Sequence, residues 1–281
     1  QIKGAYSLVI LTNKKLIGVR DPFGIRPLVL GEKDGSPVLA SETCALDMIG
    51  AKYIRDVENG EIVIITESGI ESIKPFQKVL ERPCIFERIY FASPDSIVGN
   101  KTVYTYRKAL GEQLANENNI TADVVVPIPD SGVSAAIGFS QKSFIPFELG
   151  IIRSHYVGRT FIEPSQTIRQ FGVKLKHSVN KSCIENKKVI LIDDSIVRGT
   201  TASKIVKMVY EAGAKEVHLG ISCPPIMHPD FYGIDTPNYN ELIASQFDLK
   251  EMTKHVGTKS LFFLLSSRIS HSSIGYSPVK Q

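Results

Sequence analysis

Two adjacent carboxylates stand at the end of an apolar segment in the string VILIDDSIVRGTT, residues 189–201. The apolar half predicts a buried strand, so Asp193 and Asp194 come at the carboxyl end of that strand. A turn rich in small residues follows, and backbone N–H groups at the start of the next helix can bind a dianionic phosphate. The carboxylates can accept hydrogen bonds from sugar hydroxyls or bind a hard cation. The string therefore predicts a site for a phosphorylated sugar.

A simpler interpretation is that Asp194 or Ser195 only caps the helix. That role would account for a lone Asp-Asp-Ser, but not for a strand, an acid pair and a small-residue turn in this order. We therefore expect Asp193 and Asp194 to contact the sugar, and the turn after them to bind its phosphate. The residues expected in that turn are Ser195, Ile196, Val197, Arg198, Gly199, Thr200 and Thr201.

A second turn follows another apolar run, at residues 124–128. It consists of Pro129, Asp130, Ser131 and Gly132. The N–H groups of a turn that leads into a helix could bind a second anionic group such as pyrophosphate. The same residues are common in ordinary turns and helix starts, and taken alone they favour that interpretation.

The elements that carry these turns alternate along the chain after residue 83. Apolar runs predict strands at 124–128, 148–152, 188–193, 216–221 and 259–265, and helical spacing predicts helices at 102–116, 132–141 and 201–212. This alternation predicts a parallel sheet wrapped by helices, with ligands at the carboxyl ends of its strands.

The first eighty or so residues have a different pattern. Short β-branched runs separated by turn residues predict strands at 5–11, 16–20, 28–31, 38–41, 61–66 and 69–73, with one short helix at 44–49. Strands spaced this closely favour antiparallel sheets. We place a domain boundary near residues 75–85, and expect the Ser-rich residues 266–281 to form a frayed tail.

Composition excludes several classes of protein. Lys and Arg number 33 and Asp and Glu 29 among 281 residues, and the resulting net charge of +4 is too mild to indicate nucleic-acid binding. The sequence has no apolar run of membrane-spanning length. It has four cysteines and no Cys-x-x-Cys pair, which argues against a disulfide framework and favours a cytoplasmic location.

Residues 189–201 resemble the phosphoribosyl pyrophosphate signature of type I phosphoribosyltransferases. Further segments narrow the resemblance to the glutamine phosphoribosylpyrophosphate amidotransferase family. This resemblance extends from the start of the chain to about residue 265. The supporting segments are RDPFGIRPL (20–28), IYFASPDS (89–96), VPIPDSG (126–132), YVGRTFIEPSQ (156–166) and CPPIMHPDFYGID (223–235).

This resemblance implies an α/β fold in two domains. A partial N-terminal-nucleophile glutaminase β-sandwich would occupy residues 1–80. A type I phosphoribosyltransferase domain, with a parallel sheet and helices on both faces, would occupy 81–265, and the tail 266–281.

The resemblance also implies an activity, the formation of 5-phosphoribosylamine from phosphoribosyl pyrophosphate and ammonia, which is the first committed step of purine synthesis. Asp193 would hold ribose hydroxyls and Asp194 would lie beside the leaving group. Ser131 would join both acids at a Mg²⁺ ion. Because pyrophosphate is a good leaving group, the protein mainly positions reactants and screens charge, and we expect no covalent nucleophile in this half.

A basic segment, residues 153–181, lies between the two turns. Charge runs of this kind are usually solvated surfaces. The mixture of aromatic, Gly and Arg residues at 156–161 favours a mobile flap instead. The resemblance implies that the flap closes over the substrate, with Tyr156 contacting it and Arg159 catalytic. His155 and Glu163 depart from the usual family residues, and both changes could weaken the closed state.

The family's glutaminase uses a cysteine at the chain's first position, whereas this chain starts with Gln1. We therefore expect no glutaminase activity, although the sequence does not say whether an upstream chain supplies the missing part. Cys44 is interpreted as a buried structural cysteine. Some family members bind a 4Fe–4S cluster, but here only Cys84 matches a ligand position, and Asp230 stands at a second.

Other functions stay open at this point. A phosphoribosyltransferase acting on a nucleobase would fit the acid pair, although the N-terminal β segment and the flap argue against it. A catalytically silent binding module and an inert remnant of a decayed gene are the remaining alternatives. By family analogy we expect a homo-oligomer that binds small-molecule substrates, with neither nucleic acid nor a membrane as partner.

Overall fold

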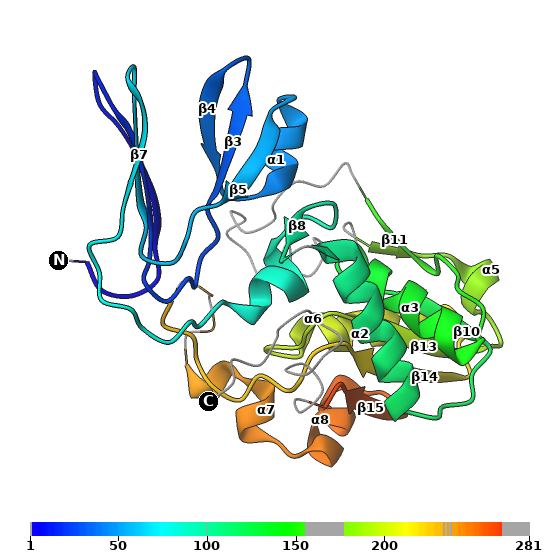
Figure 1. Ribbon diagram of the computed structural model, residues 1–281. Coiled ribbons are helices and arrows are strands. Elements are labelled where there is room, and N and C mark those ends of the chain that lie inside the picture. Colours follow the sequence, from blue (N-terminus) through cyan, green and yellow to red (C-terminus); the bar gives the residue numbers. More distant parts are fainter. Residues whose placement is uncertain are drawn as a thin grey trace, which may run out of the picture. The chain divides into compact units, whose positions relative to one another are not determined.

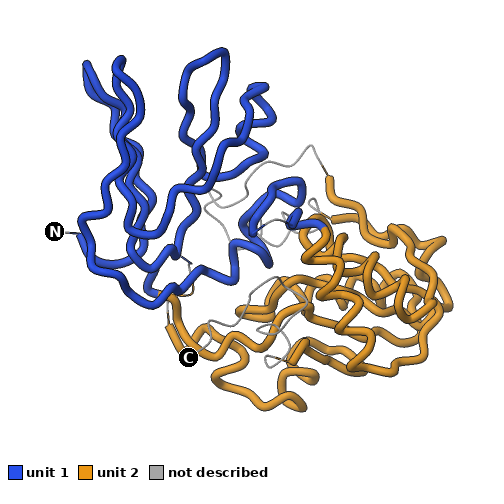
Figure 2. The backbone as a smooth tube through the Cα atoms, viewed as in Figure 1, with its two compact units in different colours: residues 1–104, 231–234 blue, residues 105–230, 235–281 orange. Residues whose placement is uncertain are grey.

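The computed structural model describes residues 2–99, 101–154, 177–232, 234, 236 and 238–265. The chain divides into two compact units (Figure 2). Unit 1 comprises residues 1–104 with 231–234, and unit 2 comprises residues 105–230 with 235–281. The boundary that the sequence predicts, near residue 80, stays a prediction. No helix among the described residues has the length and apolarity needed to cross a membrane.

Unit 1 contains two antiparallel sheets, as the closely spaced strands predict. The first has the order β1 (Ser7–Leu11), β2 (Leu16–Arg20), β6 (Ile62–Thr66), β7 (Gly69–Ile73), and the second has the order β4 (Ser36–Ala40), β3 (Val29–Lys33), β5 (Lys52–Asp56). Helix α1 (Thr43–Met48) lies between β4 and β5 in the chain. The unit also contains a π-helical turn, η1 (Glu87–Phe91), and a short hairpin, β8 (Ile97–Val98) with β9 (Lys101–Thr102).

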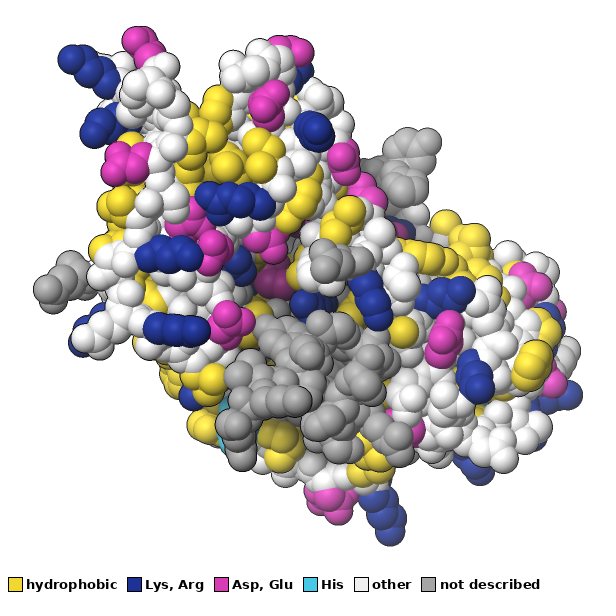
Figure 3. All heavy atoms as spheres, in the orientation of Figure 1, with side chains coloured by type: hydrophobic (Ala, Val, Ile, Leu, Met, Phe, Trp, Pro, Cys, Tyr) yellow, Lys and Arg dark blue, Asp and Glu magenta, His cyan; other side chains and the backbone are white. Residues whose placement is uncertain are grey.

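One hydrophobic cluster of unit 1 lies beneath these strands. Its buried members are Leu28, Leu30, Val57, Val63 and Ile65. Other hydrophobic side chains stay on the surface, and Figure 3 shows several of them on the visible face near β3 and β4. The strand β5 was not predicted, because all but one of its residues are exposed and its charged side chains hide any alternation.

Unit 2 is built on a parallel sheet with the order β10 (Val124–Pro127), β13 (Lys188–Asp193), β14 (Glu216–Ile221), β15 (Ser260–Phe263). Helices α2 (Val103–Glu117) and α3 (Val133–Ser143) cover one face, and α6 (Thr200–Glu211) and α8 (Leu249–Val256) cover the other (Figure 1). The smaller elements are β11 (Ile151–Arg153), β12 (His177–Val179), α5 (Lys181–Ile184), η3 (Tyr239–Glu241) and α7 (Ile243–Gln246).

The burial of both sheet faces explains why the strands of unit 2 read as continuous apolar runs. Residues 189–192 of β13 have no exposed surface. On α6 the buried residues recur at helical spacing: Ala202, Ile205, Val206 and Val209. The sequence therefore predicts the four strands of this sheet and the helices α2, α3 and α6, with bounds that agree within a few residues.

One predicted strand, at 148–152, differs from the structure. The chain runs parallel to β10 only around Phe147, where the Val125 N–H donates to the Pro146 carbonyl (2.8 Å) and the Glu148 N–H donates to the Val125 carbonyl (3.0 Å). The strand that follows, β11, begins at Ile151 and pairs antiparallel with β12. The predicted bounds were wrong because an apolar run shows that a strand is present, but not where it changes partner.

Candidate active site

The acid pair lies at the carboxyl edge of the parallel sheet. Asp193 is the last residue of β13, and Asp194 follows it directly. Beyond the neighbouring strand, the Ser222 N–H donates to the Asp193 carbonyl at 3.0 Å. Asp194 is 5% exposed, whereas Asp193 is half-buried. The fold therefore places both carboxylates where α/β sheets bind ligands.

Each of the two carboxylates accepts a hydrogen bond from the residue that follows it in the chain. The Asp193 Oδ1 atom accepts a hydrogen bond from the Asp194 N–H (2.9 Å), and Asp194 Oδ1 accepts one from the Ser195 hydroxyl (3.1 Å). Asp194 Oδ2 is buried and has no hydrogen-bond partner among the described residues. Burial, and then the charge of Asp194, raise the pKa of Asp193 well above its ordinary value, and burial raises that of Asp194.

Two further residues share this electrostatic environment, and the sequence analysis singled out neither. Burial, followed by the charges of Asp194 and Asp193, raises the pKa of the Cys223 thiol. Arg107 on α2 is 5% exposed, and its charge lowers the pKa of Asp194, opposing the effect of burial. Arg107 stands four residues after the buried Val103 and three before the buried Leu110. The sequence signal that could have identified Arg107 was a charged residue among the apolar positions of a predicted helix.

The acid pair fits a bound divalent cation. A buried carboxylate oxygen without a partner and raised carboxyl pKa values are both features that a nearby cation would relieve. No group of three or more His, Cys, Asp or Glu side chains in the described part of the chain could hold a metal. Mg²⁺ commonly binds one or two carboxylates and takes its other ligands from water and substrate phosphates. The residues present therefore fit Mg²⁺ that binds together with an anionic substrate.

The turn after the acid pair leads into the open start of α6. Gly199 precedes the helix with φ at 74°, and no side chain caps the helix. The interpretation that Asp194 or Ser195 only caps α6 is therefore wrong. The first N–H groups of a helix have no partner inside it, so they are free to bind an anion. Ile196 is buried, whereas Thr200 and Thr201 are exposed at the first helical positions.

The second turn is packed against the end of β13. The Ile128 N–H donates to the Ile192 carbonyl (2.8 Å), and a Cβ at Gly132 would lie 2.3 Å from the same oxygen. Glycine is therefore required at position 132. Gly132 directly precedes α3, Pro129 and Ser131 are half-buried, and the exposed Asp130 forms an ion pair with Arg153. Both predicted turns thus lie beside the last residues of β13.

Other predicted residues lie elsewhere. Tyr156 and Arg159 fall outside the described residues, as do residues 155–176 of the basic segment 153–181 and the tail at 266–281. Cys44 is half-buried, with its Sγ atom 3.8 Å from Glu42 Oε2. Cys84 is also half-buried, and burial raises the pKa of its thiol. All four cysteines are free.

Two protein families match separate parts of the chain. The family described as phosphoribosyl transferase domain matches residues 100–231, and the glutamine amidotransferase domain family matches residues 1–48. The first match covers the acid pair and both turns.

Similar proteins of known name cover nearly the whole chain. An amidophosphoribosyltransferase from Rhizobium etli is 59% identical over 270 residues, which are 94% of this chain and 54% of that protein. The amidophosphoribosyltransferase of Bacillus subtilis is 49% identical over 263 residues, 94% of this chain and 55% of that protein. The chain spans about half the length of the curated relatives it matches.

A solved structure is similar as well. It is the glutamine phosphoribosylpyrophosphate amidotransferase from B. subtilis complexed with ADP and GMP, with a TM-score of 0.89 and 48% sequence identity. The match covers 95% of this chain and 59% of that one.

Proposed function

The chain belongs to the amidophosphoribosyltransferase family, and we propose that it forms 5-phosphoribosylamine and pyrophosphate from phosphoribosyl pyrophosphate and ammonia. This reaction would be the first committed step of purine synthesis. The observation that carries the proposal is the pair of the half-buried Asp193 and the buried Asp194, which lies between the uncapped start of α6 and the turn at 129–132.

The roles follow from the charges of the substrate. We assign the 5′-phosphate to the N–H groups of residues 195–201 and the pyrophosphate to Pro129, Asp130, Ser131 and Gly132. Asp193 accepts hydrogen bonds from the ribose hydroxyls, and Asp194 lies beside the leaving group. In the reaction the bond from C1 to the pyrophosphate oxygen breaks, the bond from C1 to nitrogen forms, and the ammonium group formed at C1 loses a proton.

Ser131, Asp193 and Asp194 are the residues that we propose for Mg²⁺. When bound, the ion would neutralise charge on the departing pyrophosphate. The protein contributes position and electrostatic screening, so neither a side-chain nucleophile nor a covalent intermediate is needed. Tyr156 and Arg159 stay predictions for a closing flap.

The source of ammonia, the assembly and the location also stay proposals. We propose that the 281-residue chain accepts free ammonia as the nitrogen donor. A 4Fe–4S cluster is not part of the proposal, because Cys84 alone matches a ligand position. We further propose a cytoplasmic homo-oligomer, which family membership supports.

Pyrophosphate release from phosphoribosyl pyrophosphate and Mg²⁺ tests the function, with ammonium, glutamine or a purine base as the second reactant. We expect turnover with ammonium alone. Turnover that requires a purine base would instead support a nucleobase phosphoribosyltransferase. Binding without turnover would support a silent binding module, and absence of both would support an inert remnant.

The variant that tests the roles of the two aspartates is the double substitution Asp193→Asn with Asp194→Asn, which keeps side-chain size and removes both charges. We expect it to abolish phosphoribosyl pyrophosphate binding measured by calorimetry. Unchanged binding would refute the assigned roles. Asp47→Asn, at an exposed position of α1, is the control and should bind as the unmodified chain does.

A further inference from the structure

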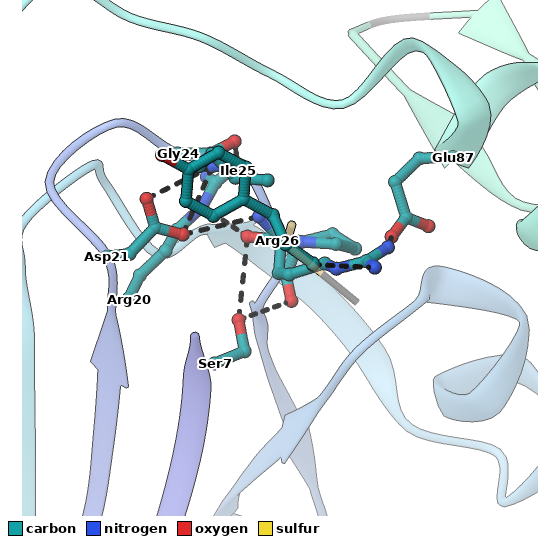
Figure 4. A network of polar contacts seen from close by, with 9 residues as sticks. Ser7, Arg20, Asp21, Gly24, Ile25, Arg26 and Glu87 are labelled. Carbon is teal, nitrogen blue, oxygen red and sulfur yellow. Dashed lines mark hydrogen bonds and ion pairs between the residues drawn. The ribbon is translucent and has the colours of Figure 1, made fainter. Parts of the chain in front are cut away.

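Two sequence motifs that the proposed function does not use meet at Arg26. This residue belongs to RDPFGIRPL, and its Nη2 atom donates a hydrogen bond to the Tyr232 carbonyl (3.1 Å), in the segment PDFYGID. Its Nη1 atom forms an ion pair with Glu87 Oε1 at 2.7 Å (Figure 4). The guanidinium also lies over the Phe91 ring, with Cζ 5.1 Å from the ring centroid. The Arg26 side chain thus contacts η1 and also Tyr232, which lies 206 positions after Arg26 in the chain.

The backbone of Arg26 is held firmly on both sides. The carboxylate of Asp21, which has no exposed surface, accepts hydrogen bonds from the N–H groups of Phe23, Ile25 and Arg26. The Arg26 carbonyl accepts a hydrogen bond from Arg20 Nε (3.0 Å), and Figure 4 shows these residues around the turn. A guanidinium that starts from a fixed backbone and is already paired with Glu87 has little freedom, so it can fix the carbonyl that it contacts.

Tyr232 lies in the middle of a segment whose two ends reach the proposed site. We call the described residues from Ser222 to Ile243 the return segment. At its start, Ser222 bonds to Asp193, and the buried Cys223 lies within the electrostatic influence of the acid pair.

At the other end of the return segment, Glu241 forms an ion pair with Arg198 (2.6 Å), and the Ile243 N–H donates to the Val197 carbonyl (2.9 Å). Arg198 and Val197 belong to the turn assigned to the 5′-phosphate. The return segment therefore touches the acid pair at one end and the phosphate turn at the other.

We propose that Arg26 is a positioning residue for the phosphoribosyl pyrophosphate site, and that it acts by holding the Tyr232 carbonyl and with it the return segment. The inference rests on the proposed function, since that function defines the substrate. Arg26 itself touches no reacting atom. Its loss leaves the groups of the site in place but lets the segment that braces them move, which weakens substrate binding.

The central variant is Arg26→Met, which keeps a long side chain but removes both polar contacts. We expect the Kd for phosphoribosyl pyrophosphate, measured with Mg²⁺ by calorimetry, to rise about tenfold. The KM in the ammonium reaction should rise in parallel, while kcat changes by less than about twofold. Arg26→Lys should give an intermediate rise of about threefold, because lysine can pair with Glu87 but lacks the guanidinium fork.

Arg55→Met is the matched control. Arg55 is another ion-paired arginine of unit 1, bound to Glu61 (2.7 Å), and its hydrogen bonds and ion pairs with described residues do not reach the return segment. We expect this control to lower thermal stability without changing the Kd by more than about twofold. An equal rise in Kd for Arg26→Met and Arg55→Met would overturn the proposal, and so would an unchanged Kd for Arg26→Met.

Amide hydrogen exchange tests the positioning role without any ligand. The amides of Ser222 and Ile243 should exchange faster in Arg26→Met than in Arg55→Met. If the unmodified chain fails to bind phosphoribosyl pyrophosphate, the proposed function fails, while the exchange result still decides the role of Arg26. If Arg26→Met does not fold, Arg26→Lys and Glu87→Gln replace it with the same controls, and unchanged exchange in both would overturn the inference.

Discussion

At the scale of single residues, the acid pair is a cost to the fold that a bound cation would reduce. Burial and the closeness of the two adjacent carboxyl groups disfavour their ionised form. One of them has a buried oxygen that lacks a partner among the described residues. Arg107 opposes this effect only in part, because burial still leaves the pKa of Asp194 raised. Residues that destabilise the free protein and would be stabilised by a cation and a sugar are typical of binding sites.

Asp194→Asn should therefore stabilise the chain while it removes substrate binding. A carboxyl group with a raised pKa in the folded state contributes to the free energy of unfolding. This contribution is fully present below the ordinary pKa of 3.8 and is lost as the pH rises through the raised value. The unmodified chain should thus lose stability over that interval, and the variant should lose less of it. At pH 7 we expect the variant to unfold at a higher urea concentration than the unmodified chain.

The matched control for this change is Asp47→Asn, at an exposed position, which should leave both stability and binding unchanged. A variant that is clearly less stable than the unmodified chain at pH 7 would show that Asp194 supports the fold, contrary to the burial argument.

At the scale of elements, β6 and the residues before it are held by a buried ion pair. Glu61 has a side chain that is 1% exposed, and it accepts hydrogen bonds from Arg55, Ser72 and the Glu58 N–H. Burial raises its pKa, but these hydrogen bonds outweigh burial and lower the pKa to about 2. The carboxylate therefore ties β6 to β5 and β7 at one end of both sheets.

Glu61→Gln should destabilise unit 1 in a pH-dependent way. A lowered carboxyl pKa contributes stability that is present above the ordinary value of 4.5 and is lost as the pH falls through about 2. At pH 7 the substitution should cost about 3 kcal/mol, and the difference from the unmodified chain should shrink below pH 4. Urea unfolding followed from pH 7 to pH 2 measures both quantities, and a pH-independent difference would contradict the assignment.

The elements also show which parts of the fold the sequence could predict. The strand β13 and the acids after it were predictable, because burial on both faces demands a continuous apolar run that ends at polar residues. The helix α8 was missed, although Asp248 and Glu251 form a capping box and Gly257 ends the helix. The contact of Arg26 with Tyr232 left no signal at all, because a backbone carbonyl accepts hydrogen bonds whatever its side chain.

At the scale of the whole molecule, the described residues of unit 2 enclose their apolar side chains more completely than those of unit 1 do. Both edge strands of the first sheet, β1 and β7, expose hydrophobic residues: Val9 (53%), Ile10 (45%), Leu11 (79%), Ile70 (45%) and Ile73 (38%). Edge strands that carry apolar side chains can pair with another chain through their free backbone groups. We therefore expect the 281-residue chain to associate through these strands when it is studied by itself.

Sedimentation over a range of concentrations measures that association. The unmodified chain should form species that grow with concentration at about 10–100 μM, the range in which exposed edges associate. Ile10→Lys on β1 combined with Ile70→Lys on β7 should suppress this growth, since charged side chains block edge pairing. Glu71→Lys, also on β7, changes charge without removing an apolar side chain and should suppress it less. A single oligomer of fixed size, unaffected by the double substitution, would show that another surface joins the copies.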